Sequence, residues 1–362
     1  MKRIVVLTSG GDSPGMNAAL RAIAKLGAAQ GLQVFGSLEG YDGLIDGKFR
    51  ELTRVLSDGA VSVDIEVDAA GGQGGTLIGS ARSARFREKD GRTKAADEVR
   101  KLGAEGVIVI GGNGSLTGAH NFAIESGLKV MGIPGSIDND IGCTSTSLGV
   151  DTALNTIVEA CDRISDTARA HKRAFVVEVM GRDCGYLAMA SAVAMAADAA
   201  LIRESGKSEE QLIDDVRTVI RNGFARGKRR ILIIKAEGIT VPCTRLVRMT
   251  EEAMKEEVPN LEIRATVLGH VVRGGNPSYS DRAVAGRLGF GALNSLLAGA
   301  TDEMVGWLPP IPQGGTPTSD SSVVRFSLER VLEETRALID GTSPVTKRRV
   351  ALMSAASGVL SL

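Results

Sequence analysis

The sequence has few aromatic residues, few histidines and no long apolar run. Only 3% of its 362 residues are aromatic, and the three histidines, His120, His171 and His270, stand alone, which disfavours a histidine-based metal site. The longest apolar stretch, Leu187–Ala197, is too short to cross a bilayer. Four cysteines without C-x-x-C spacing favour reduced thiols and a cytoplasmic protein.

An excess of charge of either sign is also lacking. Lys and Arg total 43, as do Asp and Glu, so overall charge predicts neither a nucleic-acid partner nor an anionic membrane partner. The apolar run after Met1 ends at Ser9, too early for a secretory signal. Neither G-x-x-x-x-G-K-[ST] nor G-x-G-x-x-G is present, which excludes a Walker nucleotide site and disfavours a dinucleotide-dependent oxidoreductase.

Glycine, in contrast, is abundant. The chain has 45 glycines, well above the usual share of about 7%, while 43% hydrophobic and 24% charged residues are ordinary for a folded protein. The excess therefore belongs to particular backbone positions, where φ is positive or something approaches the main chain closely.

Val- and Ile-rich runs alternate with Ala-rich amphipathic stretches. Continuous apolar strands separated by helices predict a doubly wound α/β fold with a mostly parallel sheet, and the length predicts two lobes. The predicted strands are Lys2–Thr8, Gly106–Ile110, Lys129–Ile133, Arg173–Val179 and Arg230–Ala236, and the clearest helices are Met16–Ala29 and one from about Ser115.

Three of these strands end in glycine-containing loops. The loops are TSGGDSPGMNAAL (Thr8–Leu20), IGGNGSLTGA (Ile110–Ala119) and GIPGSIDNDIG (Gly132–Gly142). Ligands of open α/β sheets bind outside the carboxyl ends of strands, and a glycine turn before a helix lets backbone N–H groups approach a phosphate. One such loop could be an ordinary tight turn, but three together favour a polyphosphate site.

Acidic and basic side chains accompany these loops. Asp138 and Asp140 could accept a substrate proton and hold Mg²⁺, or could simply be turn residues. Glu237, after another strand, could accept a sugar hydroxyl or merely end the strand. Arginine forks near glycines suit phosphate oxygens, although most arginines are solvated; the candidates are Arg82, Arg85, Arg87, Arg173, Arg182, Arg264 and Arg273.

The motifs TSGGDSPGMNAALR, GSAR, IGGNGS, PGSIDNDI, VEVMGRDCG and RATVLGHVVRGGNPS, in this order, resemble the 6-phosphofructokinase family over residues 1 to about 300. The resemblance implies two Rossmann-like lobes with the active site in the cleft between them, and phosphoryl transfer from MgATP to the 1-hydroxyl of fructose 6-phosphate. It implies a larger nucleotide-binding lobe of residues 1–149 with 271–325, and a smaller sugar-phosphate-binding lobe of residues 150–270 with 326–362.

The resemblance also implies residue roles. Asp138 would be the general base, with Asp140, Arg182 and Ser136 as further catalytic residues. Nucleotide contacts would come from Gly11, Arg82, Arg87, Gly112, Asn113, Gly114 and Ser115. Substrate contacts would come from Ser136, Asp138, Arg173, Met180, Gly181, Arg182, Glu237, Arg264, His270 and Arg273. Arg173 and Arg264 would come from a neighbouring subunit, which implies shared active sites in a homotetramer.

Three positions qualify this expectation. Gly114 and Gly135 stand at the two positions where the motifs of pyrophosphate-dependent family members have Asp and Lys, so these glycines favour ATP as the phosphate donor. A pyrophosphate-dependent enzyme and a kinase for another sugar phosphate are the alternatives. Asn113 replaces the family's usual metal-binding Asp, and a neutral amide is a weaker Mg²⁺ ligand. A non-catalytic, regulatory relative is therefore a further alternative, which an intact Asp138 disfavours.

An effector site is expected with less support from the sequence. The bacterial members of the family have an effector site between subunits, and a site of this kind would allow control by ADP or phosphoenolpyruvate. The residues at matching positions here are Arg21, Arg54, Asp198, Lys228 and Arg229. Ser165 and Lys25, however, stand where arginines are usual. The basic stretch Arg221–Arg230 could equally be a solvated helix end.

Overall fold

The computed structural model describes residues 1–258, 261–308, 315–319, 323–347 and 350–351. The chain forms two compact units. Unit 1 comprises Met1–Ile137, Ile141–Thr152 and Arg273–Arg336, and unit 2 comprises Asp138–Asp140, Ala153–Val272 and Ala337–Leu362. Among the described residues, no helix is both long and apolar enough to cross a membrane.

Unit 1 contains an eight-stranded sheet. In spatial order its strands are β13 (Thr316–Pro317), β14 (Val323–Ser327), β12 (Glu303–Trp307), β7 (Lys129–Pro134), β6 (Gly106–Gly111), β1 (Arg3–Ser9), β2 (Gln33–Ser37) and β3 (Phe49–Glu51). The five strands from β12 to β2 are parallel to one another. Beyond them, β14 pairs antiparallel with β12, β13 pairs antiparallel with β14, and β3 pairs antiparallel with β2. A separate hairpin pairs β4 (Thr53–Val55) with β5 (Val61–Val63).

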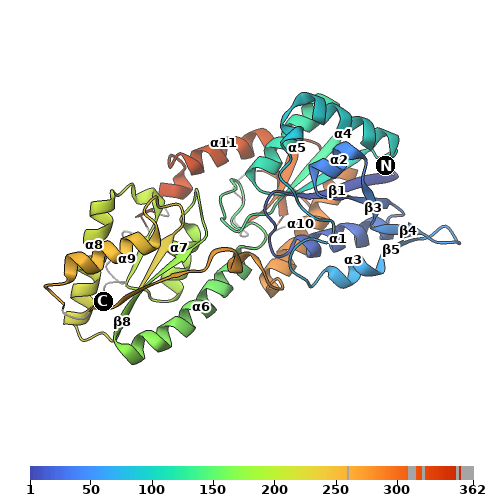
Figure 1. Cartoon of the computed structure of the whole chain (residues 1–362). Helices are drawn as coiled ribbons and strands as arrows, with labels where there is room; N and C mark the ends of the chain where they lie inside the picture. The colour runs from blue at the N-terminus through green and yellow to red at the C-terminus, as the bar shows by residue number, and fades with distance from the viewer. Residues whose placement is uncertain (259–260, 309–314, 320–322, 348–349, 352–362) are drawn as a thin grey trace. The chain divides into compact units, whose positions relative to one another are not determined.

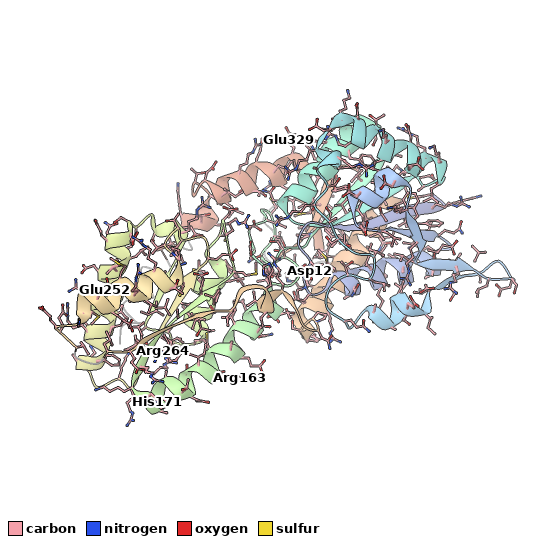
Figure 2. The ribbon with its side chains drawn as sticks, in the orientation of Figure 1. Asp12, Arg163, His171, Glu252, Arg264 and Glu329 are labelled. Atoms are coloured by element: carbon pink, nitrogen blue, oxygen red, sulfur yellow. The ribbon has the colours of Figure 1, made fainter. Side chains whose placement is uncertain are left out.

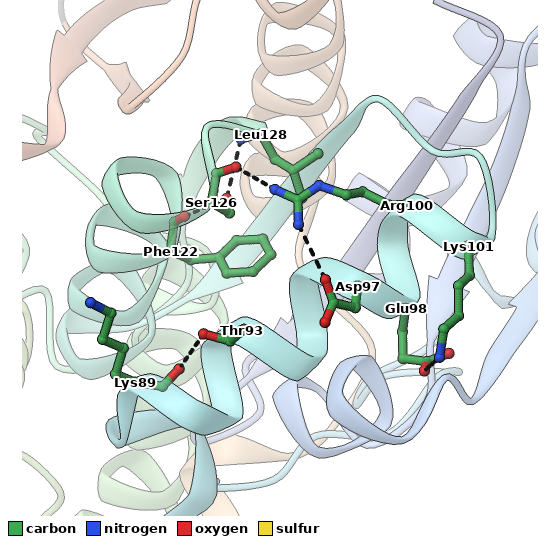
Figure 3. A network of polar contacts seen from close by, with 9 residues as sticks. All are labelled: Lys89, Thr93, Asp97, Glu98, Arg100, Lys101, Phe122, Ser126 and Leu128. Atoms are coloured by element: carbon green, nitrogen blue, oxygen red, sulfur yellow. Dashed lines mark hydrogen bonds and ion pairs between the residues drawn. The ribbon is translucent and has the colours of Figure 1, made fainter.

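Helices cover both faces of this sheet, as continuously apolar parallel strands require. One face packs against α1 (Met16–Ala29), α3 (Ile65–Ala70) and α10 (Tyr279–Leu297), and the other against α2 (Tyr41–Asp46), α4 (Lys89–Lys101), α5 (Asn113–Ser126) and α11 (Leu328–Ile339) (Figure 1). The short η1 (Arg85–Arg87) precedes α4. Figure 3 shows α4 joined to the end of α5, where Arg100 donates to the Ser126 carbonyl at 2.6 Å.

Unit 2 contains a smaller, entirely parallel sheet. Its strands, in spatial order, are β11 (Ile263–Val267), β8 (Arg173–Val179), β10 (Arg230–Ala236) and β9 (Ala199–Leu201). A core on one face is shared with α8 (Glu209–Ala225) and α9 (Cys243–Met254), while α7 (Tyr186–Ala194) contacts β8, β9 and β10. The remaining elements are α6 (Val150–His171), η2 (Arg203–Ser205) and η3 (Gly269–Arg273).

These sheets confirm the predicted α/β, doubly wound class. The helix Met16–Ala29 and the strands Arg173–Val179 and Arg230–Ala236 have the predicted bounds. The predicted strands Gly106–Ile110 and Lys129–Ile133 each extend one residue further, and the predicted Lys2–Thr8 is shifted by one residue to Arg3–Ser9.

The unit boundaries differ from the expected lobe boundaries mainly near the C-terminus. Residues 326–336 belong to unit 1, because β14 pairs with β12 and because Leu328 and Val331 on α11 pack in the unit 1 core. Residues 150–152 also belong to unit 1, and residues 271–272 to unit 2. Residues 348–349 and 352–362 of the expected smaller lobe lie outside the described residues.

Candidate active site

The three glycine loops lie on adjacent strands of unit 1. They follow β7, β6 and β1, which are neighbours in the parallel sheet, so all three leave its carboxyl edge. The Gly135 N–H donates to the Gly111 carbonyl at 2.9 Å, and a Cβ on Gly111 would lie 2.5 Å from the Ser9 carbonyl oxygen. Backbone therefore packs against backbone here, as the glycine excess predicted.

Two helices begin at this edge. Helix α1 follows Gly15, whose φ of 102° places it in the left-handed region that favours glycine, and α5 follows Gly112. Neither helix has a side-chain cap, so the unsatisfied N–H groups and positive dipole of each first turn suit a phosphate. Ser115 is buried in the first turn of α5, and its carbonyl accepts a hydrogen bond from the Tyr41 hydroxyl at 2.6 Å.

The segment around Arg82 is fastened to the first loop. Ser80 donates its hydroxyl to the Gly10 carbonyl at 2.8 Å, and the Gly10 N–H donates to the Ala81 carbonyl at 3.3 Å. Arg82 and Arg87 are exposed, and neither guanidinium pairs with a carboxylate of the described part of the chain. Both are therefore available for a solvent-borne anion.

Arg273 lies against the same loop. Its Nη1 atom donates to the carbonyl of Asp12, labelled in Figure 2, at 3.3 Å, and lies 3.0 Å from where a Cβ on Gly11 would be. Unit 1 thus brings Gly11 and Arg273 together, although the resemblance assigned them to different ligands.

The acidic segment follows β7 directly. Ser136 is half-buried in unit 1, while Asp138 and Asp140 are half-buried and group with unit 2. Asn139 between them has a φ of 52°, so the backbone turns there. The turn-residue interpretation of this segment is therefore correct for Asn139, and it leaves a chemical role for the two carboxylates open.

Asp281 anchors the chain that continues from this segment, and the sequence analysis missed it. Its carboxylate accepts hydrogen bonds from the Gly149 N–H at 2.9 Å, the Thr152 N–H at 2.8 Å and the Thr152 hydroxyl at 2.6 Å. Asp281 is 2% exposed, and burial raises the pKa of its carboxyl group above the ordinary value. The Ser278-x-x-Asp281 spacing at the start of α10 was the available signal, because Ser278 caps that helix.

The carboxyl edge of the unit 2 sheet carries the other predicted substrate residues. Met180, Gly181 and Arg182 follow β8, Glu237 follows β10, and His270 follows β11. The Glu237 N–H donates to the Val179 carbonyl at 2.9 Å, and the Gly238 N–H donates to the Gly181 carbonyl at 3.1 Å. Gly181 has a φ of 122°, and a Cβ on Gly238 would lie 2.0 Å from the Arg182 carbonyl oxygen, so both positions require glycine.

Arg173 and Arg264 lie elsewhere in unit 2. Arg173 is the first residue of β8, about 20 Å along the strand from Met180. Both guanidiniums pair with Glu262, and the hydrogen bond from Arg173 lowers the pKa of that carboxyl group. Arg264 is labelled in Figure 2. Within this chain, therefore, neither arginine joins the carboxyl-edge loops of the unit 2 sheet.

The expected effector residues divide between the units. In unit 2, Lys228 pairs with Asp198 at 2.8 Å, and both line a cavity of about 580 Å³ with Arg229. The same cavity is lined by Arg169, which the sequence analysis did not assign, and by Arg230, the last residue of the basic stretch Arg221–Arg230.

The unit 1 members of this set already have acidic partners. Arg21 and Lys25 pair with Asp68, and their hydrogen bonds lower the pKa of that carboxyl group. Arg54 pairs with Asp64. An anion binding to these side chains would therefore compete with carboxylates of the chain itself.

A site that holds a metal by protein ligands alone is not found among the described residues. They contain no cluster of three or more His, Cys, Asp or Glu side chains suited to a metal. Asn113, half-buried at the start of α5, offers one neutral oxygen. This donor set fits Mg²⁺ that arrives on a nucleotide, since Mg²⁺ usually takes few protein ligands besides phosphates and water.

The two glycines expected to distinguish phosphate donors have different surroundings. A Cβ on Gly114 would meet nothing within 4 Å, whereas one on Gly135 would lie 3.2 Å from the Met16 side chain and 3.4 Å from the Ser13 hydroxyl. Space for a larger group is therefore available at Gly114, while Gly135 is packed against the first loop.

Unit 1 has a mostly parallel sheet with three glycine loops at its carboxyl edge, and unit 2 has a parallel sheet whose carboxyl edge carries loops with Arg182 and Glu237. This arrangement is typical of the α/β class of proteins that bind phosphorylated ligands. Comparison with known proteins specifies the class. The phosphofructokinase family model matches residues 3–296, and the chain belongs to this family.

Curated relatives have similar lengths. The chain is 46% identical over 308 residues to the ATP-dependent 6-phosphofructokinase of Natranaerobius thermophilus, covering 84% of this chain and 89% of that one. It is 43% identical over 306 residues to the enzyme of the same name from Brevibacillus brevis, with the same coverage.

Solved structures agree with the fold. The phosphofructokinase of Saccharomyces cerevisiae matches with a TM-score of 0.83 and 32% identity over 99% of this chain, which spans 50% of the yeast chain. A pyrophosphate-dependent phosphofructokinase from Marinobacter aquaeolei matches with a TM-score of 0.75 and 19% identity over 91% of this chain and 84% of its own, and shows the fold alone.

Proposed function

We propose that the chain transfers the γ-phosphoryl group of ATP to the 1-hydroxyl of fructose 6-phosphate and so forms fructose 1,6-bisphosphate. The observation that carries this proposal is the adjacency of three glycine loops at one sheet edge of a chain whose curated relatives are ATP-dependent 6-phosphofructokinases. In this proposal the loops after β1 and β6 hold the nucleotide phosphates, assisted by Gly11, Arg82, Arg87, Gly112 and Ser115.

Asp138 is the proposed general base, and takes the proton of the 1-hydroxyl as that oxygen attacks the γ-phosphorus. Its half-buried position after β7 supports this role. Asp140 supports the base, while Arg182 and the Ser136 hydroxyl stabilise charge on the transferring group. Met180, Gly181, Glu237, His270 and Arg273 bind the sugar phosphate.

Arg173 and Arg264 act in a neighbouring subunit's site in this proposal. Their position at the amino end of β8 and near that of β11, remote from the loops of their own unit's sheet, supports a homotetramer with shared active sites. Control by ADP or phosphoenolpyruvate at the basic cavity of unit 2, and a cytoplasmic location, are parts of the same proposal.

Asn113 would help to hold a Mg²⁺ ion bound with the nucleotide, and this ion would supply positive charge against the negative charge that develops during transfer. Asn113 would orient this ion through its amide oxygen, more weakly than a carboxylate would. Asn113 therefore suits a metal carried by the nucleotide. Having Asn here in place of the family's usual Asp lowers the affinity for Mg²⁺, while Asp138 remains as the proposed base.

Parallel assays with ATP and with pyrophosphate, each with fructose 6-phosphate, test the donor. We expect fructose 1,6-bisphosphate only from ATP, because Gly114 leaves open space beside the first turn of α5. Product formed from pyrophosphate alone would contradict the proposed donor and favour the pyrophosphate-dependent alternative. No product from either donor, with fructose 6-phosphate still binding, would favour the regulatory alternative.

Asp138→Asn tests the base. We expect kcat to fall by roughly 10²–10⁴-fold with little change in either KM, because the general base acts on the chemical step. Asp97→Asn is the matched control, since Asp97 is an exposed carboxylate whose partner is Arg100 on the same helix (Figure 3). Unchanged turnover in Asp138→Asn would refute this assignment.

A further inference from the structure

Lys235 is a charged side chain in the interior of the unit 2 sheet. It lies on β10 and is 0% exposed. Its register partner on β8 is Glu178, and the Lys235 Nζ atom lies 2.8 Å from a Glu178 carboxylate oxygen. The Glu178 side chain is half-buried, with 17% of it exposed, so the pair desolvates the ammonium completely and the carboxylate in part. An apolar pair of similar volume is often as stable as an ion pair in such surroundings. Its presence here therefore calls for a role besides stability.

The ammonium group of Lys235 has an acceptor for each of its three donors. Besides Glu178, Nζ donates to the carbonyl of Ala236 at 3.2 Å and to the carbonyl of Ile239 at 3.4 Å. These two carbonyls stand on either side of Glu237 and Gly238, so one cation holds both ends of the turn that carries Glu237.

Glu178 links the same cation to one further loop. Its carbonyl accepts a hydrogen bond from the Leu268 N–H at 3.0 Å, at the start of the segment that carries His270. The next carbonyl along β8, that of Val179, accepts the Glu237 N–H at 2.9 Å. The ion pair therefore lies beneath three loops that carry proposed sugar-phosphate contacts.

We propose that Lys235 is a positioning residue for the sugar-phosphate site. Held by Glu178, its ammonium fixes the Ala236 and Ile239 carbonyls and thereby sets the direction of the Glu237 carboxylate. This role rests on the proposed function, because it requires Glu237 to contact fructose 6-phosphate. A purely structural ion pair is the competing explanation.

Lys235→Met, Glu178→Gln and the double variant separate the two explanations. Lys235→Met leaves the Glu178 carboxylate without its partner, so we expect a lower melting temperature and a KM for fructose 6-phosphate raised about ten- to a hundred-fold. The KM for ATP should stay within about two-fold, since the nucleotide loops belong to unit 1.

In the double variant no unpaired charge is left buried, so the melting temperature should recover toward that of the parent. The KM for fructose 6-phosphate should stay raised, because the two carbonyls are still not held. Recovery of both quantities together would show that the pair is only structural and would overturn the proposal, as would equal changes in both KM values.

Pairing Lys235→Met with Glu237→Ala gives a second measurement. If Lys235 acts through Glu237, the two changes should be strongly non-additive in kcat/KM for fructose 6-phosphate, whereas additive effects would overturn the proposal. Lys207→Met is the matched control, because Lys207 forms an exposed ion pair with Asp215 at 2.6 Å in the same unit.

Equilibrium binding of fructose 6-phosphate to the parent chain completes the experiment. Binding and turnover by the parent, unaffected in Lys235→Met, would overturn the positioning role alone. A parent that neither binds nor phosphorylates fructose 6-phosphate would overturn the proposed function and the positioning role with it.

Discussion

Replacing Asp281 with Asn tests whether three hydrogen bonds outweigh the cost of burying a carboxylate. One oxygen of Asp281 accepts the Gly149 N–H, and the other accepts both the N–H and the hydroxyl of Thr152. The Thr152 hydroxyl accepts the Ser278 N–H at 2.9 Å, so its own proton is directed at Asp281. An Asn side chain in its better orientation keeps the two bonds to Thr152 and points its NH₂ group at the Gly149 N–H.

The substitution therefore leaves at least one buried backbone N–H facing another donor. That loss amounts to about 1–3 kcal/mol. Against it stands the relief of desolvation, which is the largest cause of the raised pKa of the Asp281 carboxyl group. We expect the lost bond to prevail and Asp281→Asn to melt roughly 3–9 °C below the parent. Asp281→Ala, which removes all three bonds, should melt lower still.

The pH dependence fixes the sign of the desolvation effect. Because the folded pKa of Asp281 lies above its ordinary value of 3.8, the protonated form stabilises the fold below that value, and this contribution is lost as pH rises through the folded pKa. The difference in melting temperature between parent and Asp281→Asn should therefore narrow as pH rises from about 4 to 7. Thermal unfolding across this range measures it, with Asp97→Asn as an exposed control that should shift little.

Four further substitutions test the two sheet edges. Gly238→Ala should raise the KM for fructose 6-phosphate about ten-fold or more in steady-state kinetics, because the new Cβ would lie 2.0 Å from the Arg182 carbonyl oxygen; an unchanged KM would show that these loops do not bind the sugar. Gly114→Ala should fold as stably as the parent, whereas Gly135→Ala should melt a few degrees lower, since only the Cβ at position 135 would contact tightly packed atoms. Equal melting temperatures of the two variants would contradict the packing described. Asn113→Asp should lower the Mg²⁺ concentration at half-maximal rate, and an identical Mg²⁺ titration in parent and variant would show that this side chain does not face the metal.

Local patterns predicted the sheets well because strand formation here depends on short apolar runs. The strand Arg173–Val179 is buried at five of its seven positions, and a run of that kind is legible in the sequence. The same reasoning placed the three glycine loops at one edge of the sheet, because the carboxyl ends of parallel strands lie at the same edge. The other strands were not predicted, because β2, β11, β12 and β14 are only five residues long and β3, β4, β5, β9 and β13 have only two or three residues, too few to carry a clear pattern.

Contacts between residues distant in sequence could not be predicted in the same way. Asp281 is more than 120 residues away in sequence from its partners Gly149 and Thr152, and no pattern in the sequence around Asp281 indicates these partners. The sequence indicates only that Lys235 is part of a strand, and its ion pair with Glu178 became visible only once β8 lay beside β10. The extension of unit 1 past residue 325 depends on a contact of the same kind, the pairing of β14 with β12.

The glycine excess and the balanced overall charge are both consistent with the way the loops are held at the carboxyl edges of the two sheets. In each unit, loops from adjacent strands are joined by main-chain hydrogen bonds, such as Gly135 to Gly111 in unit 1 and Gly238 to Gly181 in unit 2. Glycine is needed there because a Cβ on Gly111 or Gly238 would overlap a neighbouring carbonyl oxygen. Since the backbone holds these loops together, side chains such as the exposed Arg82 and Arg182 need no partner to keep the loops in place. Their charges are therefore free for the phosphorylated ligands that we propose, in a chain whose formal charges balance overall.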